Sequence, residues 1–566
     1  MKSIYRVLGL GLLALLTALP PLLLVPPTAK PDEAAHWAYA VHLAQTGALP
    51  PYVSPDDAAS REANQPPLYY GLAAAVSRLT DDPAAFAERA VNPFLLATGR
   101  GNRHVWLLSP DAARLFSIGR TISLLFWLLV PLATLWAWQP VLGPSTSAGV
   151  AAFMSLVPLL PFIGSAYSND MLSVLLIVVA FGTSIRLFDA GTAVGWRWAA
   201  LLGLALGLSL LTKLYAIPLV AALALLAVAP FVRLHPTRRI QLLAAVTLAT
   251  AMLLPWIWAN LQRFGDPLGF AVSRHVMGYD PQGLRVDKVL VVAGQSWRTY
   301  WADLGPGGVD SLSLPAALAL GLLELAALAG FIRRVRRSPL HPLALFLILW
   351  VSVTLALLGW TFLRSGVMII SGGRNAIYLH LVNAPLLMLG LHEWFGSARA
   401  ARRFVIGIGL LLTIWAWGYL LTTYPPVLRE PLNEQAAPQA SFGSAYVLLD
   451  ADVRPTDDGL AVRFAVAKVA PDDVQLAYFV QVVSPAGELL ANLNTYPAYG
   501  ALSSVYWPVG STVRECYQLP LPTSAPPDSR VLIGLWQPLT GARMPAFDPL
   551  GHPLADDAVA LPVPSP

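Results

Sequence analysis

Asp32 and Glu33 stand directly after the first apolar segment of the chain, within the run PDEAAH that ends at His36. Acidic residues next to a membrane-length apolar segment are energetically costly and often functional. A carboxylate there can act as a general base, which takes a proton from an attacking hydroxyl group. The competing interpretation is structural, because Asp commonly caps the start of a helix. Asp32 and Glu33 are therefore candidate catalytic residues, with helix capping as the alternative.

A third acidic residue and an aromatic motif could complete such a site. Asp170 ends the run Ser-Asn-Asp before a later apolar segment, and it could share a metal or bind an acceptor unless it too is a cap. Gln65, Tyr69 and Tyr70 belong to the run NQPPLYY, in which the two prolines can start a helix. The aromatic rings could line a groove for a sugar or lipid, and the alternative is an interfacial tyrosine belt.

Two basic residues suit an anionic ligand. Lys213 interrupts a long apolar stretch, and Arg374 lies in the run GGRN ahead of another apolar segment. A guanidinium group can bond two phosphate oxygens at once, so Arg374 is a candidate phosphate contact. Lys213 is a second candidate contact to the same phosphate. The alternatives are a snorkelling lysine and an arginine that anchors the chain at the interface.

A metal site is left open by the sequence. His36, His42 and Glu62 could bind a divalent cation, but their spacing is not diagnostic. The single cysteine, Cys516, excludes an intrachain disulfide and a cysteine-based zinc site.

The composition indicates a membrane protein with many spans. Of the 566 residues, 56% are hydrophobic and only 12% are charged, about half the charged fraction of soluble proteins. Segments long and apolar enough to span a bilayer lie near 7–25, 115–138, 146–163, 169–187, 198–212, 214–232, 240–260, 312–332, 342–362, 376–392 and 404–424. The sequence therefore predicts a polytopic α-helical membrane protein with about eleven transmembrane helices.

Charge placement predicts the orientation. With the N-terminus in the cytoplasm, the short loops that carry Arg clusters, near residues 186–197, 233–239, 333–337 and 399–403, all fall on the cytoplasmic side. Loops 26–114 and 261–311 and the C-terminal part are then extracytoplasmic. The basic residues thus indicate topology, and nucleic acid is not expected as a partner.

The C-terminal part has a different composition. A linker is expected at 426–441, and residues 442–552 contain short β-like runs at 461–466, 476–483, 488–493, 512–519 and 530–536. Turn residues separate these runs, which predicts an antiparallel β-sandwich. Gly534 suggests a bulge in the last run. The Ala- and Pro-rich tail, 553–566, is expected to be loose.

In their order along the chain, the motifs around Asp32, Gln65, Asp170, Lys213 and Arg374 resemble those of the GT-C glycosyltransferases. The likeness is to the protein mannosyltransferase and aminoarabinose transferase group and its bacterial relatives, and it spans residues 1–425. One difference is that Asn375 follows Arg374, where relatives often have Tyr.

The resemblance implies an enzyme of the cell membrane that moves a hexosyl or pentosyl group from a polyprenyl-phosphate donor to an acceptor hydroxyl at the outer face. It makes Asp32 the base, Glu33 its neighbour and Asp170 the second acid, with Lys213 and Arg374 facing the lipid phosphate. His36, Gln65, Tyr69 and Tyr70 are expected to contact substrate. The acceptor is a protein, a lipid or a glycan.

Two other functions are alternatives. A transporter or lipid flippase would place charges near the membrane midplane and often shows internal repeats, which this sequence lacks. A non-catalytic scaffold that displays the C-terminal domain explains the β-like runs but not Asp32 and Glu33.

Overall fold

The computed structural model describes residues 2–54, 56–78, 89–94, 106–189, 192–229, 234–277, 286–305, 310–336, 342–365, 372–424, 429–433, 437–521 and 525–564. The chain forms two compact units. One contains residues 1–25, 30–83 and 115–420 and is helical, and the other contains residues 26–29, 84–114 and 421–566 and is built mainly of strands.

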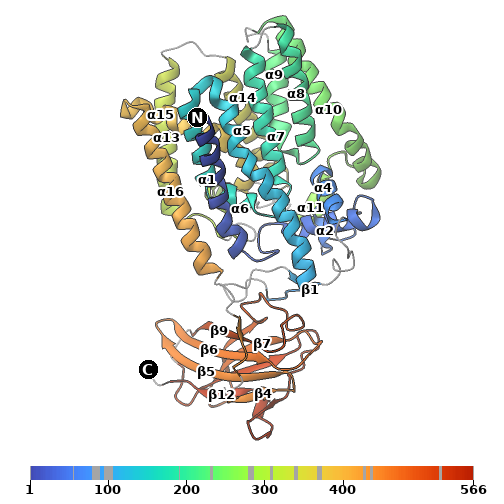
Figure 1. Ribbon diagram of the computed structural model, residues 1–566, viewed down its shortest axis with the longest axis vertical. Helices are drawn as coiled ribbons and strands as arrows, with labels where there is room; N and C mark the ends of the chain where they lie inside the picture. The colour runs from blue at the N-terminus through green and yellow to red at the C-terminus, as the bar shows by residue number, and fades with distance from the viewer. Residues whose placement is uncertain are drawn as a thin grey trace. The chain divides into compact units, whose positions relative to one another are not determined.

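The helical unit is a bundle of long apolar helices, with α2 (Glu33–Thr46), α4 (Leu68–Ser77) and α11 (Phe270–Met277) near one end of it (Figure 1). The long helices are α1 (Lys2–Leu24), α5 (Pro110–Leu156), α7 (Asp170–Asp189), α8 (Thr192–Leu210), α10 (Pro236–Phe264), α13 (Leu314–Arg336), α14 (Pro342–Ser365) and α16 (Ala398–Thr423). The shorter ones are α2 (Glu33–Thr46), α3 (Ala58–Arg61), α4 (Leu68–Ser77), α6 (Leu159–Gly164), η2 (Leu214–Ala216), α9 (Ile217–Val228), α11 (Phe270–Met277), α12 (Val286–Trp301), η4 (Gly372–Leu379) and α15 (His380–Phe395).

Seven of the described helices are long and apolar enough to cross a membrane: α1, α5, α7, α10, α13, α14 and α16. The prediction of a polytopic helical membrane protein is confirmed. The predicted spans 115–138 and 146–163 both fall largely in α5, which non-helical backbone at Gly143 divides into two parts. The second of these spans does not reach residue 163 as one helix, because the chain breaks between α5 and α6 near Pro158.

Three other predicted spans correspond to helices that are not among these seven. The segments 198–212 and 214–232 correspond to α8 and to η2 with α9, and the extended backbone of Lys213 separates them as expected. The segment 376–392 corresponds to the end of η4 and to α15. Its start is a 3₁₀ helix that includes Arg374, so this arginine belongs to a helical turn and not to a preceding loop.

The β unit consists of two antiparallel sheets and a separate hairpin. Its strands are β1 (Arg89–Val91), β2 (Trp106–Leu108), β3 (Arg429–Pro431), β4 (Ala440–Phe442), β5 (Tyr446–Thr456), β6 (Gly459–Lys468), β7 (Ala477–Val483), β8 (Leu489–Thr495), β9 (Ser511–Pro520), β10 (Arg530–Trp536), β11 (Ala546–Phe547) and β12 (Val559–Pro562). The sheet orders are β12-β10-β7-β8 and β11-β4-β5-β6-β9-β3. Apolar side chains from both sheets form one core, so the predicted antiparallel β domain is confirmed.

Three details of the predicted β domain are corrected. The tail 553–566 is not loose, because its strand β12 pairs with β10 through Val559–Pro562. The linker 426–441 contains strand β3 and the start of β4. Gly534 is not at a bulge: β10 and β7 pair there without a register shift, and a Cβ atom at Gly534 would lie 2.3 Å from the Phe479 ring. Close ring packing therefore explains this glycine.

Part of the first long loop belongs to the β unit. The β1–β2 hairpin pairs Arg89–Val91 with Trp106–Leu108. Leu107 packs with Ala477 and Tyr496 of the C-terminal segment. The predicted loop 26–114 is therefore divided between the two units, with α2, α3 and α4 in the helical one.

Candidate functional site

Four charged side chains from distant segments of the helical unit form two ion pairs. Asp32 pairs with Arg374, and the Asp170 Oδ1 atom lies 2.8 Å from Lys213 Nζ. Asp32 follows α1, Asp170 begins α7, Lys213 separates α8 from η2, and Arg374 lies in η4 ahead of α15. We call these four residues the charge cluster. The structure thus brings together four of the residues that the sequence motifs singled out.

Asp32 does not act as a helix cap. It occupies the N-cap position of α2, but its side chain makes no capping hydrogen bond. Its backbone is left-handed, with φ of 59°, a conformation that few non-glycine residues adopt. Its carboxylate instead accepts a hydrogen bond from Arg374. The capping alternative is therefore wrong for Asp32, and strained backbone of this kind is common at functional sites.

The Asp32 carboxylate is ionised in this setting. The Asp32 side chain is 47% exposed, whereas the Arg374 side chain is only 8% exposed. The surrounding protein limits hydration of the carboxylate, which would raise its pKa, but the charge of Arg374 outweighs this effect and lowers the pKa to about 2. Paired in this way, Asp32 is negatively charged and only weakly basic.

The second ion pair is fully enclosed. Asp170 is completely buried, and Lys213 is 8% exposed. The Ser168 hydroxyl accepts a hydrogen bond from the Asp170 N–H group and donates one to Asp170 Oδ2 at 2.8 Å. Lys213 does not snorkel, because its ammonium group donates to Asp170 at 2.8 Å. A buried pair that is this well hydrogen-bonded holds both charges in place.

A polar network borders the charge cluster. Tyr70 is fully buried, and its hydroxyl lies 2.7 Å from His36 Nδ1. The Asn169 side-chain amide donates to that hydroxyl, to the Thr212 carbonyl and, at 3.4 Å, to Gln65 Oε1. The predicted residues His36, Gln65 and Tyr70 therefore lie together beside Asp170, and Asn169 links them.

One member of the charge cluster and two neighbouring side chains could hold a cation. Asp32, His36 and Glu62 each offer one ligand atom, and these atoms lie within 4.8 Å of one another. His36 Nε2 is buried without a hydrogen-bond partner, as expected for an unused ligand atom. Burial and the nearby Asp32 charge raise the pKa of Glu62 to about 8. Two oxygens and an imidazole nitrogen suit Zn²⁺ or Mn²⁺. His42 is not in this group.

Arg374 has spare donors. Its Nη2 atom contacts Asp32, but Nε and Nη1 are buried and have no hydrogen-bond partner among the described residues. Unsatisfied buried donors on a charged group are costly, and a bound anion would satisfy them. The neighbouring Asn375 accepts a hydrogen bond from the Tyr215 hydroxyl at 3.2 Å, which fixes this turn of η4.

Glu33 belongs to a different network. Its two carboxylate oxygens accept hydrogen bonds from Arg120 at 2.8 and 2.7 Å, and Glu33 Oε1 accepts another from the Tyr167 N–H group. The Lys30 ammonium group contacts the Ser165 carbonyl and hydroxyl at 2.7 Å. Glu33 is 1% exposed, so it anchors α2 on α5 and on the segment before α7. Lys30 and Arg120 were missed by the sequence analysis, although Arg120 is a charge inside a predicted span.

Tyr69 also has a packing environment. It is completely buried, and its hydroxyl contacts Ser123 Oγ at 2.9 Å and the Gly119 carbonyl at 3.3 Å, both in α5. Its ring packs edge-on against Tyr70 and Tyr167. Tyr69 therefore packs against Tyr70 inside the protein. Among the residues that the structure describes, it is buried and not part of an open groove.

The chain has distant similarity to a few solved structures. No protein-family model matches the chain, and no curated protein sequence matches it significantly. Among solved structures, ArnT from Cupriavidus metallidurans in the apo state is 14% identical over 75% of this chain and 79% of its own, with a TM-score of 0.44. The same protein bound to undecaprenyl phosphate is 14% identical over 74% and 78%, with a TM-score of 0.45. An Archaeoglobus fulgidus oligosaccharyltransferase complex with Zn and sulfate is 15% identical over 75% of this chain and 54% of that one, with a TM-score of 0.40.

The chain is thus a multi-pass α-helical membrane protein with a C-terminal β domain and a charge cluster built from the ends of its helices.

Proposed function

We propose that the protein is a membrane glycosyltransferase that moves a sugar from a polyprenyl-phosphate donor to an acceptor hydroxyl at the outer face of the membrane. The observation that carries this proposal is Arg374, a buried guanidinium with two unused donors beside an ionised carboxylate. Such a group suits a phosphate, and the adjacent carboxylate suits the removal of an acceptor proton. Lys213 adds a second positive charge in the same cluster.

The charge cluster can carry out the transfer in one displacement. The acceptor oxygen attacks the anomeric carbon, the bond from that carbon to the phosphate oxygen breaks, and polyprenyl phosphate leaves with the bonding electrons. Asp32 takes the acceptor proton. The phosphate group is a good leaving group once its charge is balanced, so Arg374 and Lys213 need only stabilise it electrostatically. No strong acid is required.

Donor binding would activate Asp32. In the free protein Arg374 holds the pKa of Asp32 at about 2, which makes it a weak base. A phosphate that takes over the Arg374 guanidinium brings negative charge next to Asp32 and raises its proton affinity. We infer that the carboxylate becomes an effective base only when the donor is in place.

A divalent cation fits between Asp32, His36 and Glu62, as the unused His36 nitrogen suggests. When bound, it would add positive charge next to the donor phosphate. Gln65 and Tyr70 would orient the acceptor side of the site through the hydrogen bonds that they share with Asn169 and His36. Glu33 and Tyr69 would act as positioning residues, because both are buried behind the site.

The transporter and scaffold alternatives are less well supported. Transport sites lie near the bilayer midplane and are often built from the ends of broken helices, so the position of the charge cluster at helix ends does not by itself exclude a transporter. What disfavours a transporter is the predicted location of these helix ends at the outer face. A scaffold has no use for a buried, partly unsatisfied Arg374. The arginine-rich loops predict that these helix ends lie at the outer face.

Asp32→Asn tests the proposed base. Asn keeps the size of the side chain but cannot accept the proton, so we expect transfer to fall by about 10²–10⁴-fold. Binding of undecaprenyl phosphate in nanodiscs, measured by native mass spectrometry, should be retained in Asp32→Asn and weakened at least about tenfold in Arg374→Ala. Arg374→Lys should restore binding only in part. Transfer would be assayed with a panel of polyprenyl-phosphate hexoses and pentoses, and near-normal turnover by Asp32→Asn would contradict the role of the base.

Metal removal tests the cation. Treatment with a chelator should lower transfer, and Mn²⁺ or Zn²⁺ should restore it in the wild type but not in Glu62→Gln. Metal content after dialysis against Zn²⁺, measured by mass spectrometry, gives a readout that does not depend on activity. His42→Ala is the matched control, since His42 lies outside the three-residue group. Equal metal content in the wild type and in Glu62→Gln would rule out this site.

A further inference from the structure

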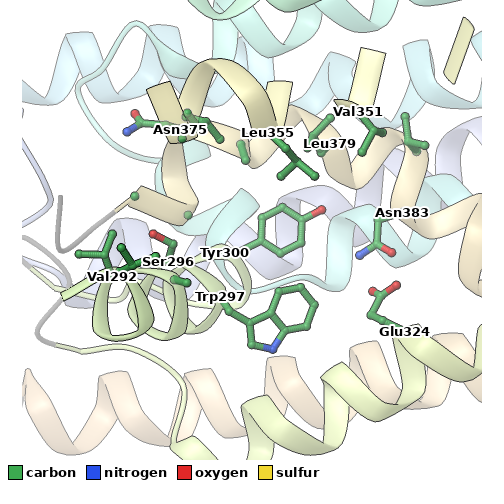
Figure 2. A pocket seen from close by; sticks show the side chains of 18 of the residues that line it. Val292, Ser296, Trp297, Tyr300, Glu324, Val351, Leu355, Asn375, Leu379 and Asn383 are labelled. Carbon is green, nitrogen blue, oxygen red and sulfur yellow. The ribbon is translucent and has the colours of Figure 1, made fainter. Parts of the chain in front are cut away.

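A cavity of about 540 Å³ lies among α12, η4, α13, α14 and α15 (Figure 2). This volume is within the range of ligand sites. Most of the lining is apolar and includes Val292, Trp297, Val351, Leu355, Leu379 and Leu386. From η4, the residues Gly372, Gly373, Asn375 and Ala376 line the cavity. Neither Arg374 nor any other member of the charge cluster lines it.

One wall of this apolar cavity carries a carboxyl group. Glu324 lies near the centre of the 23-residue helix α13. The other acidic residues in the seven candidate spans, Asp111 and Asp170, stand in the first turn of their helices. An acidic residue near the middle of a spanning helix is expensive, and such residues usually face a ligand or an ion pathway. No described Lys, Arg or His forms an ion pair with Glu324.

The polar groups beside Glu324 are incompletely satisfied. Asn383 of α15 interacts with the Glu324 carboxyl and with the Tyr300 hydroxyl. Figure 2 shows Glu324 and Asn383 side by side at one end of the cavity, with Asn375 at the other. Glu324 Oε1 and Asn383 Oδ1 are both buried and have no hydrogen-bond partner among the described residues. Two buried acceptors thus lack donors at the same place.

A pure hydrocarbon ligand would leave both acceptors unsatisfied. We propose that the cavity binds an amphiphile whose apolar body fills the pocket and whose hydroxyl or amine group donates hydrogen bonds to Glu324 and Asn383. Such a ligand matches the apolar lining and supplies the missing donors. The site is distinct from the proposed donor site, and its existence does not depend on glycosyl transfer.

The 3₁₀ helix η4 contributes residues both to the cavity and to the charge cluster. A Cβ atom at Gly373 would lie 2.1 Å from the Ser296 carbonyl oxygen and 2.2 Å from the Tyr300 nitrogen, so η4 packs directly on α12. Ser296 and Tyr300 line the cavity, and Arg374 follows Gly373 in sequence. An occupant of the cavity would therefore lie against the helical turn that holds Arg374.

Photolabelling of the full-length protein in nanodiscs tests this site. Three diazirine probes with the same C14 chain would be compared, ending in a hydroxyl, a primary amine or a methyl group. The hydroxyl or the amine probe should label cavity-lining peptides of α13 and α14 at least about fivefold more than the methyl probe, a difference of about 1 kcal/mol in binding. The better of the two polar probes identifies the head group.

Variants link the preference to the two acceptors. Glu324→Leu and Asn383→Leu should abolish the preference for the polar probe, and Glu324→Gln should retain hydroxyl binding but lose amine binding. Leu322→Ala is the control, since Leu322 is 70% exposed on the same helix. Each variant would be checked for monodispersity and Tm, and Asn383→Leu decides the outcome if Glu324→Leu does not fold. Equal labelling by all three probes, as expected for a plain hydrocarbon groove, or a preference that survives in Glu324→Leu, would overturn the proposal.

Discussion

Asp32 and Glu33 are neighbours in the chain, yet they serve two different networks. The left-handed backbone at Asp32 directs its carboxylate to Arg374, while the carboxylate of Glu33 is held by Arg120. The second network is buried and fixes the start of α2, so it holds the backbone from which Asp32 projects. The two adjacent acids therefore have separate places in the structure, Asp32 in the ion pair with Arg374 and Glu33 in the network that holds α2.

A further buried carboxyl group, Glu515, lies in the β unit. It is 3% exposed and accepts hydrogen bonds from the Ala498 N–H group at 2.6 Å and the Tyr517 hydroxyl at 2.8 Å. Ala498 and Tyr499 both have left-handed backbones, with φ of 56°. Glu515 therefore holds a strained turn in place. Burial raises the pKa of Glu515 to about 7, well above that of an exposed glutamate.

The raised pKa predicts that the β unit is less stable at higher pH. The folded state keeps the Glu515 proton up to about pH 7, but the unfolded state releases it near pH 4.5, so the free energy of unfolding falls as the pH rises through this window. The loss should be roughly 1–3 kcal/mol. Hydrogen exchange of residues 511–520 in the intact protein would measure it, with Glu515→Gln as a pH-independent control. Parallel pH profiles for the two proteins would refute this role of Glu515.

The sequence revealed the charged residues of the cluster but not their partners. Asp32, Asp170, Lys213 and Arg374 stood out because charges next to apolar segments are rare. The pairings could not be predicted, since they join segments that are up to 342 residues apart. Arg120 and Glu324 carried the same signal, as charges inside predicted spans, and applying that rule within the spans would have found both.

Helices α13 and α15 are in backbone contact through glycines. A Cβ atom at Gly390 would lie 1.9 Å from the Ala327 carbonyl oxygen, and one at Gly330 would lie 2.1 Å from the Gly390 carbonyl oxygen. Small residues allow helices in membranes to approach this closely. The contact joins the helix that carries Glu324 to the helix that carries Asn383, so it supports the proposed ligand site.

Gly390→Ala should therefore loosen this helix pair. The obstructing atom is part of the backbone and cannot rotate away, so we expect a loss of about 1–3 kcal/mol and a lower Tm. Gly407→Ala in α16 is the matched control, because a Cβ atom there meets nothing within 4 Å. Thermal unfolding in detergent would be followed by tryptophan fluorescence. A Gly390→Ala variant as stable as the control would show that the helices can separate at no cost.

Hydrophobic periodicity predicted the positions of individual helices and strands. Apolar runs located the long helices, and alternation located β6 to β10 within a few residues. Strands β5 and β12 were missed because β5 contains charged residues at exposed positions and β12 has the composition of a loose tail. The amphipathic helices α11 and α12 in loop 261–311 were not expected, although α12 lines the cavity.

For the whole molecule, the arginine-rich loops predict an orientation that fusions can test. Reporter fusions after residues 240, 335 and 400 should report the cytoplasm, and a fusion after residue 440 should report the exterior. Paired alkaline phosphatase and fluorescent protein fusions give opposite signals on the two sides of the membrane. A cytoplasmic signal at 440 would contradict both the orientation and the outer location of the charge cluster.

The β1–β2 hairpin has a consequence for how the protein is made. Its residues, 89–91 and 106–108, leave the ribosome more than 360 residues before Ala477 and Tyr496, against which Leu107 packs. The last strand, β12, ends at Pro562 and pairs with β10. Because domains generally fold as units during synthesis, the hairpin must wait through the insertion of the entire helical unit. The β unit can be completed only after Pro562 has been synthesised, so chains that stop before β12 should leave the hairpin exposed to quality-control proteases.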